Sequence, residues 1–300
     1  MNWNKEEAST LISSYKQKGF TEDMGFRVYS ARLLGKDPSL VLHGGGNSSV
    51  KLKSKNIFGE EMDTICVKGS GWDMGNIEPE GFPELDLAFL KKFESLDKLS
   101  DEEMVKIMRQ ACLDPDSPDP SVETLLHAFL PHKFIDHTHS NTNLSIANLP
   151  KATELFRELL GDRVAILPWI MPGFKLAKAC SAAYKKNENI EGIILLNHGI
   201  FSFGQSAEES FKRMKNLVNK TELLLKKKKK KKRKYKKLIK TDNSAKISSL
   251  IYKKISEASE GAAPFVRFVD SENSKVFLKN IDKNLLSGKG VITPDHVIRI

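Results

Sequence analysis

Residues 119–140, DPSVETLLHAFLPHKFIDHTHS, place a predicted helix directly before a predicted strand that carries two histidines. Helix formation restarts after Pro120, through the apolar stretch SVETLLHAFL, and FIDHTH follows as a strand. Side chains at positions i and i+2 of a strand point to the same face. We therefore expect His137 and His139 to lie side by side.

A third histidine, His198, lies within residues 192–204, GIILLNHGIFSFG, whose β-type residues predict a strand hairpin. Brought together, His137, His139 and His198 would close three sides of a tetrahedron. Three histidines leave the fourth position of a zinc ion open, as in catalytic rather than structural zinc sites. Neutral imidazole suits zinc or another borderline divalent metal, so the trio predicts a metal centre.

Other polar residues of the same stretch have alternative interpretations. Glu123 falls in the first turn of the predicted helix, where a carboxylate either stabilises the helix dipole or, beside a metal, moves a proton next to a polarised carbonyl. Asp136 either orients a metal ligand from behind or lies on the surface. His127 and His132 are expected to be structural or surface residues.

Two glycine-rich turns precede this stretch, GGGNSSV at residues 44–50 and KGSG at residues 68–71. Their backbone amides, with nearby polar side chains, could cradle a phosphate. The candidate side chains are those of Asn47, Ser48, Ser49, Ser70 and Ser121. Neither turn is a P-loop or a dinucleotide-binding fingerprint.

Predicted strands and helices alternate along the chain, so the expected fold class is α/β, a sheet covered by helices. Predicted helices span 4–34, 83–97, 101–112, 121–130, 151–160, 174–184, 207–225 and 245–258. Predicted strands include 40–42, the residues after the glycine triplet, 134–139 and RVAILPWI. We expect a main domain over 1–225, a lysine-rich insert at 226–241 and an extension over 242–300 that ends as a connector.

The net charge of +10 is local to one segment. Residues 226–240 hold eleven Lys and one Arg without an acid, so the other residues carry a net charge of −2. Such a run is usually solvated, although it could touch nucleic acid or anionic lipid nonspecifically. The three scattered cysteines, the absence of a signal peptide and the lack of a 20-residue apolar stretch favour a cytoplasmic protein without a membrane span.

Five motifs in order resemble the class II aldolase/adducin family. They are HGGGNSSVKL, VKGSGWDM, DPSVETLLHAFLPHKFIDHTHS, LPWIMPGF and LNHGIFSFG. The resemblance is greatest to the aldolase half of bifunctional rhamnulose-1-phosphate aldolase/short-chain dehydrogenase proteins. It runs from about Trp3 to Glu222 and resumes at TPDHVIR near the end of the chain.

The resemblance implies a central β-sheet flanked by helices in three layers, assembled as a homotetramer with sites near subunit interfaces. It implies that His137, His139 and His198 bind zinc, or another divalent metal, and that Glu123 is the catalytic acid/base. Asn47, Ser70, Gly71 and Ser121 match positions that hold the substrate phosphate. Where relatives often have a second hydroxyl residue before the glutamate, this chain has Val122.

The implied reaction is cleavage of a ketose 1-phosphate, similar to rhamnulose 1-phosphate, into dihydroxyacetone phosphate and lactaldehyde through a zinc-stabilised enediolate. The resemblance leaves the proton donor to the aldehyde oxygen unassigned. A sugar-phosphate epimerase or dehydratase with the same metal site, and a non-catalytic adducin-like binding module, remain alternatives. Any oxidoreductase activity would need a separate short-chain dehydrogenase, and nucleic acid is not an expected partner.

Overall fold

The computed structural model describes residues 2–228, 244–258 and 293–296. Contacts divide the chain into two compact units, residues 1–228 with 291–300, and residues 229–290. Of the second unit the structure describes the helix α10 (Ser244–Ala258), which confirms the helix predicted there. Most of the lysine-rich insert, and the strand-like FVRFVD stretch, lie outside the described residues.

The first unit is built on a mixed seven-stranded sheet with the order β3-β2-β1-β4-β7-β6-β5 in the described part of the chain. The strands are β1 (Asn47–Lys55), β2 (Glu61–Val67), β3 (Glu84–Asp86), β4 (Phe134–Thr138), β5 (Val164–Leu167), β6 (Gly192–Leu195) and β7 (Gly199–Gly204). Neighbouring strands are antiparallel except β5 and β6, which are joined by a crossover helix. The central strand β4 is buried along its whole length.

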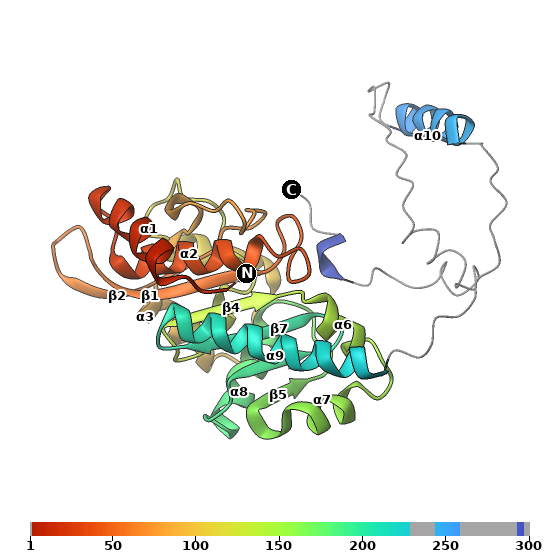
Figure 1. The fold of residues 1–300 in the computed structure, drawn as a ribbon. Helices are drawn as coiled ribbons and strands as arrows, with labels where there is room; N and C mark the ends of the chain where they lie inside the picture. Colours follow the sequence, from red (N-terminus) through yellow and green to blue (C-terminus); the bar gives the residue numbers. More distant parts are fainter. Residues whose placement is uncertain (1, 229–243, 259–292, 297–300) are drawn as a thin grey trace. The chain divides into compact units, whose positions relative to one another are not determined.

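Helices cover both faces of this sheet and form two separate hydrophobic cores (Figure 1). The α-helices are α1 (Lys5–Gln17), α2 (Glu22–Gly35), α3 (Leu87–Lys92), α4 (Asp101–Ala111), α5 (Thr124–Phe129), α6 (Asn141–Ala147), α7 (Ala152–Leu160), α8 (Phe174–Lys186) and α9 (Ala207–Lys228). One core joins α1, α2, α7 and α9 to the sheet. The other joins α3, α4, α5 and α8 to the opposite face. The three-layer α/β fold predicted from the sequence is therefore confirmed.

Several local predictions are also confirmed. The helix predicted at 101–112 is α4, which begins with a capping box in which Ser100 and Glu103 exchange side-chain and backbone hydrogen bonds. The hairpin predicted around His198 is formed by β6 and β7. Both strands are apolar and buried, as their sequences suggest.

Two local predictions are wrong. The strand predicted at 40–42 is not formed, and these residues belong to a turn and the irregular segment after it. The helical stretch predicted over 4–34, with Gly19 and Gly25 as possible breaks, consists of two helices separated near Gly19, which has a φ of 91°. The helix predicted over 83–97 begins as the short strand β3, because Leu85 and its neighbours pair with β2 at the sheet edge. Among the described residues, no helix is long and apolar enough to cross a membrane.

Candidate metal centre and active site

The strand β4 carries the histidine pair to the centre of the sheet. His137 is fully buried, its ring stacks on Phe201 with centroids 4.1 Å apart, and its Nδ1 lies 3.1 Å from the carbonyl oxygen of Ile200. His139 follows directly after the strand and is also buried. The two Nε2 atoms are 3.0 Å apart, which confirms that the pair converges on one face.

His198 comes to the same point from the turn between β6 and β7. This turn is tight, since the preceding Asn197 has a φ of 61° and Gly199 allows the ring of His137 to approach closely. One ligand atom from each of His137, His139 and His198 lies within 4.8 Å of the others, and among the described residues no other such group could hold a metal ion. The structure therefore brings the predicted trio together.

The protonation pattern of the trio fits a bound cation. If the Nδ1 atoms of His137 and His139 donate to the carbonyl of Ile200 and to the carboxylate of Asp295, both Nε2 atoms present lone pairs to each other at 3.0 Å. Two facing acceptors repel unless a cation lies between them. Burial, followed by the neighbouring histidines, lowers the pKa of His137 well below its usual value, and burial also lowers the pKa of His198. Neutral imidazole is the form that binds metal.

Glu123 lies at the edge of this trio. Its Oε2 is 3.5 Å from Nε2 of His137, and its Oε1 is 3.6 Å from Nε2 of His198. The side chain is buried, and Oε1 has no hydrogen-bond partner among the residues that the structure describes. Glu123 is the N-cap residue of α5 but makes no side-chain capping hydrogen bond, and its carboxylate lies against the histidine rings.

Asn47 holds the glutamate in place. It lies opposite His137 in the pairing of β1 with β4, and its Nδ2 donates to Oε2 of Glu123 at 2.6 Å and to Oγ of Ser121 at 3.1 Å. On its other side, Oδ1 of Asn47 is 2.6 Å from Nε2 of His127. Burial lowers the pKa of His127 to about 3, so this histidine is neutral and structural, as expected.

The two glycine-rich turns line the same pocket, a cavity of about 190 Å³. It is lined by Gly44, Gly46, Asn47, Lys68, Ser70, Gly71, Ser121, Val122, Glu123, His139, Pro172, His198 and Pro294. Asn47, Ser70, Gly71 and Ser121, which the family resemblance matches to phosphate-binding positions, are among them, whereas the candidates Ser48 and Ser49 are fully buried and do not line the pocket. The backbone amide of Ser70 donates to the carbonyl oxygen of Asp119. The side chain of Ser70 is exposed and is therefore available to contact a ligand.

Lys68 connects the two glycine-rich turns through hydrogen bonds to their backbone. Its ammonium is buried and donates to the carbonyl oxygens of Gly44 at 3.0 Å, Gly69 at 3.2 Å and Trp72 at 2.6 Å. Burial lowers its pKa to about 8. Its ammonium therefore supports the backbone of both turns.

Asp136 serves neither role expected of it. It points to the face of β4 opposite the histidines, where it forms a fully buried ion pair with Arg27 of α2. Its second oxygen accepts a hydrogen bond from Oγ of Ser210 of α9 at 2.5 Å. Successive side chains of a strand point to opposite faces of the sheet, so Asp136 faces away from its neighbour His137.

The sequence interpretation missed a buried carboxylate near the end of the chain. Oδ1 of Asp295 lies 2.7 Å from Nδ1 of His139, and both side chains are buried. The connector predicted at the end of the chain is wrong for Thr293–Asp295, because this segment contacts the site. The segment belongs to TPDHVIR, where the family resemblance resumes, and that position is the sequence feature that indicates a role in the site.

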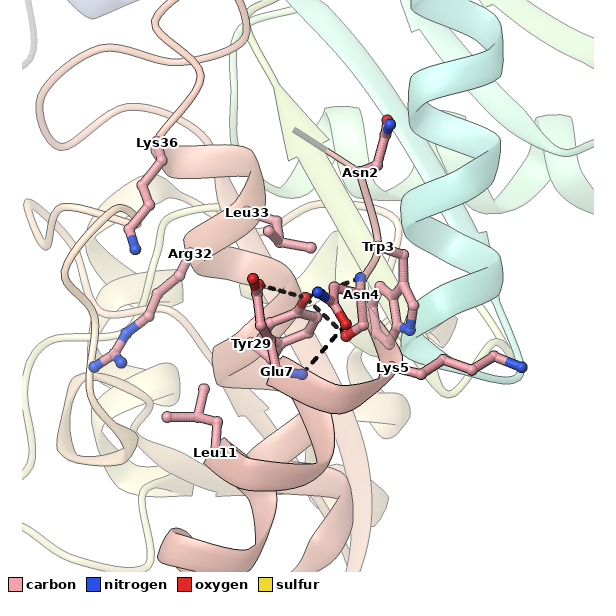
Figure 2. Close-up of a pocket in the computed structure, with 10 residues that line it drawn as sticks. All are labelled: Asn2, Trp3, Asn4, Lys5, Glu7, Leu11, Tyr29, Arg32, Leu33 and Lys36. Atoms are coloured by element: carbon pink, nitrogen blue, oxygen red, sulfur yellow. Dashed lines mark hydrogen bonds between the residues drawn. The ribbon is translucent and has the colours of Figure 1, made fainter.

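A larger pocket of about 860 Å³ lies elsewhere, beside the beginning of α1 and one side of α2 (Figure 2). Figure 2 shows Asn4, Glu7 and Tyr29 joined there by hydrogen bonds. Arg32 in its wall already pairs with Glu78. None of the three histidines lines this pocket, so it is separate from the candidate metal centre.

A family model described as the class II aldolase and adducin N-terminal domain matches residues 27–225. The chain belongs to the class II aldolase and adducin family. That match contains the three histidines, Glu123 and both glycine-rich turns, and it ends before the lysine-rich insert. The family membership expected from the five motifs is thus confirmed.

Solved structures of class II aldolases agree with this assignment. The N-terminal class II aldolase domain of a conserved protein from Thermoplasma acidophilum is 40% identical, covers 69% of this chain and 95% of its own, and superposes with a TM-score of 0.65. A sugar-phosphate aldolase from Thermotoga maritima is 17% identical over 66% of this chain and 91% of its own, with a TM-score of 0.50, and shows the shared fold alone.

A relative from Bacillus subtilis, named uncharacterized oxidoreductase YuxG, is 28% identical over 308 residues. The match takes in 99% of this chain and 42% of that relative. The chain thus spans less than half the length of this relative.

Proposed function

We propose that this class II aldolase family member is a metal-dependent aldolase that cleaves a ketose 1-phosphate, similar to rhamnulose 1-phosphate, into dihydroxyacetone phosphate and lactaldehyde. One observation carries the proposal: a buried carboxylate lies within 3.6 Å of two ring nitrogens of a histidine trio, and the same pocket is walled by two glycine-rich turns. A metal centre, a proton carrier and an anion cradle thus share one cavity.

His137, His139 and His198 would hold the metal, and their neutral, buried rings suit zinc or a similar divalent ion. When bound there, zinc would supply a Lewis acid for the ketose oxygens. The three ligand atoms lie within 4.8 Å of one another, and nitrogens about 3.4 Å apart are what a tetrahedral zinc requires. The trio would therefore accept the ion with small side-chain shifts.

Glu123 would carry the proton. In the cleavage direction, the bond between C3 and C4 of the sugar breaks, and C3 of the dihydroxyacetone phosphate product gains a proton from this carboxyl group. The hydrogen bond from Nδ2 of Asn47 to Oε2 fixes the carboxylate, so that Oε1, which lacks a partner among the described residues, is the oxygen directed at substrate. The 4-hydroxyl loses its proton to a base that lies outside this set.

Asn47, Ser70, Gly71 and Ser121 would bind the phosphate. The backbone of these turns is held by Lys68, and Gly71, with a φ of 77°, keeps the second turn in a conformation that favours glycine. Val122 lines the pocket and is 45% exposed, where a hydroxyl residue is frequent in relatives. The phosphate would accordingly rely on the four residues named and on backbone amides.

We further propose that residues 1–225 form the catalytic domain and that residues 226–241 and 242–300 are an insert and an extension. A homotetramer and a cytoplasmic location accord with the family resemblance and with the three free cysteines. The relation to bifunctional aldolase/dehydrogenase proteins is compatible with the match to the longer YuxG. Nothing in the comparisons supports a separate dehydrogenase chain as a partner.

The test combines metal analysis with substrate profiling of the full-length protein. We expect about one zinc or similar ion per chain, lost in His198→Ala. Against a panel of ketose 1-phosphates, Glu123→Gln should keep its metal and lose about 100- to 10,000-fold in kcat for cleavage. Glu158→Gln, on the exposed side of α7, is the matched control and should behave as wild type.

Other outcomes separate the alternatives. Metal binding with product formation but without dihydroxyacetone phosphate release would indicate an epimerase or dehydratase at the same site. A well-folded, zinc-supplemented protein without bound metal would contradict the aldolase proposal and favour an adducin-like binding module.

A further inference from the structure

We propose that Asp295, from the short turn η4 (Pro294–His296), is a positioning residue that holds His139 in its metal-binding orientation and tautomer. The proposal rests on the metal site proposed above and not on the identity of the sugar. Three observations carry it: two hydrogen bonds, a matching gap at a glycine, and the difference between the three histidines.

The carboxylate of Asp295 joins two distant parts of the chain. Its Oδ1 lies 2.7 Å from Nδ1 of His139, and its Oδ2 accepts a hydrogen bond from the backbone amide of Leu42 at 3.2 Å. Asp295 is 3% exposed, and its own amide donates to Oγ1 of Thr293, which is also buried. A carboxylate this deeply buried needs such partners, because desolvation of a charge without them is costly.

The glycine-rich turn that forms one wall of the pocket leaves room for this carboxylate. A Cβ added to Gly45 would lie 1.6 Å from Oδ1 of Asp295, which is far too close for atoms that are not bonded to each other. Any side chain at position 45 would therefore displace this carboxylate. Beside it, Pro294 lines the pocket itself, so this turn contributes directly to the wall of the site.

The chemical effect is on the tautomer of His139. A carboxylate accepts a hydrogen bond from Nδ1–H and so keeps the proton on Nδ1, which leaves the lone pair of Nε2 directed toward His137 and the metal position. Negative charge behind the ring also makes it a stronger ligand. His137 has a neutral carbonyl at the equivalent position, and Nδ1 of His198 has no partner among the described residues. His139 is thus the one ligand of the three with a carboxylate behind it in the described structure.

The first experiment measures zinc affinity by competition with a chromophoric chelator, on the full-length protein. We expect Asp295→Ala to weaken binding by roughly 10- to 100-fold, and Asp295→Asn, which keeps an acceptor but loses the charge, by less. Asp97→Asn, an exposed carboxylate on the same unit, is the matched control and should bind zinc as wild type does. Circular dichroism confirms that each variant is folded.

A double-mutant cycle separates positioning from a general structural effect. If Asp295 acts through His139, Asp295→Ala should cause the full loss of zinc affinity in a Glu123→Gln background, which keeps all three histidines, but no further loss from the residual affinity of a His139→Ala background. Equal losses in both backgrounds would show that Asp295 only supports the fold, and would overturn the proposal.

Nuclear magnetic resonance of metal-free protein gives a readout that needs neither metal nor substrate. Nitrogen-15 shifts of the histidine rings should show the Nδ1–H tautomer for His139 in wild type and a mixture in Asp295→Ala. A wild-type protein that binds no zinc would contradict the proposed function, whereas unchanged zinc affinity and an unchanged tautomer in Asp295→Ala would contradict this inference alone.

Discussion

Substitution of Asp136 by Asn is expected to destabilise the protein without weakening its metal site. Asp136 and His137 are adjacent on β4 but face opposite sides of the sheet. The carboxylate of Asp136 neutralises the guanidinium of Arg27, and both side chains are fully buried. The variant removes that negative charge and leaves the cation in an apolar layer.

The size of the effect follows from the partners that remain. Arg27 would keep hydrogen bonds to the carbonyls of Ser49 at 3.2 Å and Ile135 at 3.3 Å, and to Oγ of Ser30 at 2.7 Å. Breaking a buried ion pair from one side costs about 3 to 5 kcal/mol, and since Asn still offers an acceptor, we expect about 3 kcal/mol. Replacing both partners, as in Arg27→Met with Asp136→Leu, should recover most of this loss, because no buried charge remains.

Urea unfolding at pH 7 and fixed protein concentration measures the stability, and chelator competition measures zinc affinity. The expected result is a lower midpoint for Asp136→Asn, a recovered midpoint for the double variant, and wild-type zinc affinity for Asp136→Asn. An Asp136→Asn protein of normal stability whose zinc affinity falls tenfold would refute the reasoning, since it would mean that the aspartate acts on the metal ligands.

Three further predictions concern other residues. Burial lowers the pKa of His132 to about 4, so between pH 6.5 and pH 4 the unfolded state binds more protons than the folded state. The free energy of unfolding should therefore fall by up to about 3 kcal/mol as the pH drops from 6.5 to 4. In His132→Phe, which keeps the stack on Phe203, unfolding midpoints should lose that part of the pH dependence. Lys68→Met should leave three carbonyls without their buried donor, lower the unfolding free energy by about 2 kcal/mol or more and raise KM more than it lowers kcat, as steady-state kinetics would show. Zinc at 100 times its Kd should stabilise wild type by about 2.7 kcal/mol in thermal unfolding and leave His198→Ala nearly unchanged.

The sequence predicts the parts of the site that depend on local periodicity. His137 and His139 could be placed on one face because a strand repeats every two residues, and His198 could be added because it lies within the predicted strand hairpin. The same periodicity could have placed Asp136 on the opposite face, but its partner Arg27 lies 109 positions away, and no local pattern identifies such a partner.

The remaining parts depend on long-range packing. Asp295 contacts Leu42 across 253 positions, and the turn that carries it has no helical or strand pattern of its own. Leu40 and Val41 are apolar as a strand would be, yet they are buried in a turn, because the glycine-rich segment that follows must bend toward the pocket. Apolar character predicts burial at these positions but cannot distinguish between the conformations that achieve it.

The two faces of β4 have a consequence for how the chain selects its strand pairing. A slip of one residue would turn Asp136 toward the face where His198 lies, and would place His137 against the buried guanidinium of Arg27. The shifted arrangement would leave Arg27 without its counter-charge and scatter the nitrogens that now converge. A shifted β4 would thus lose stabilising polar contacts on both faces of the sheet. The two polar clusters therefore favour a single register of β4 during folding, before any metal or substrate is present.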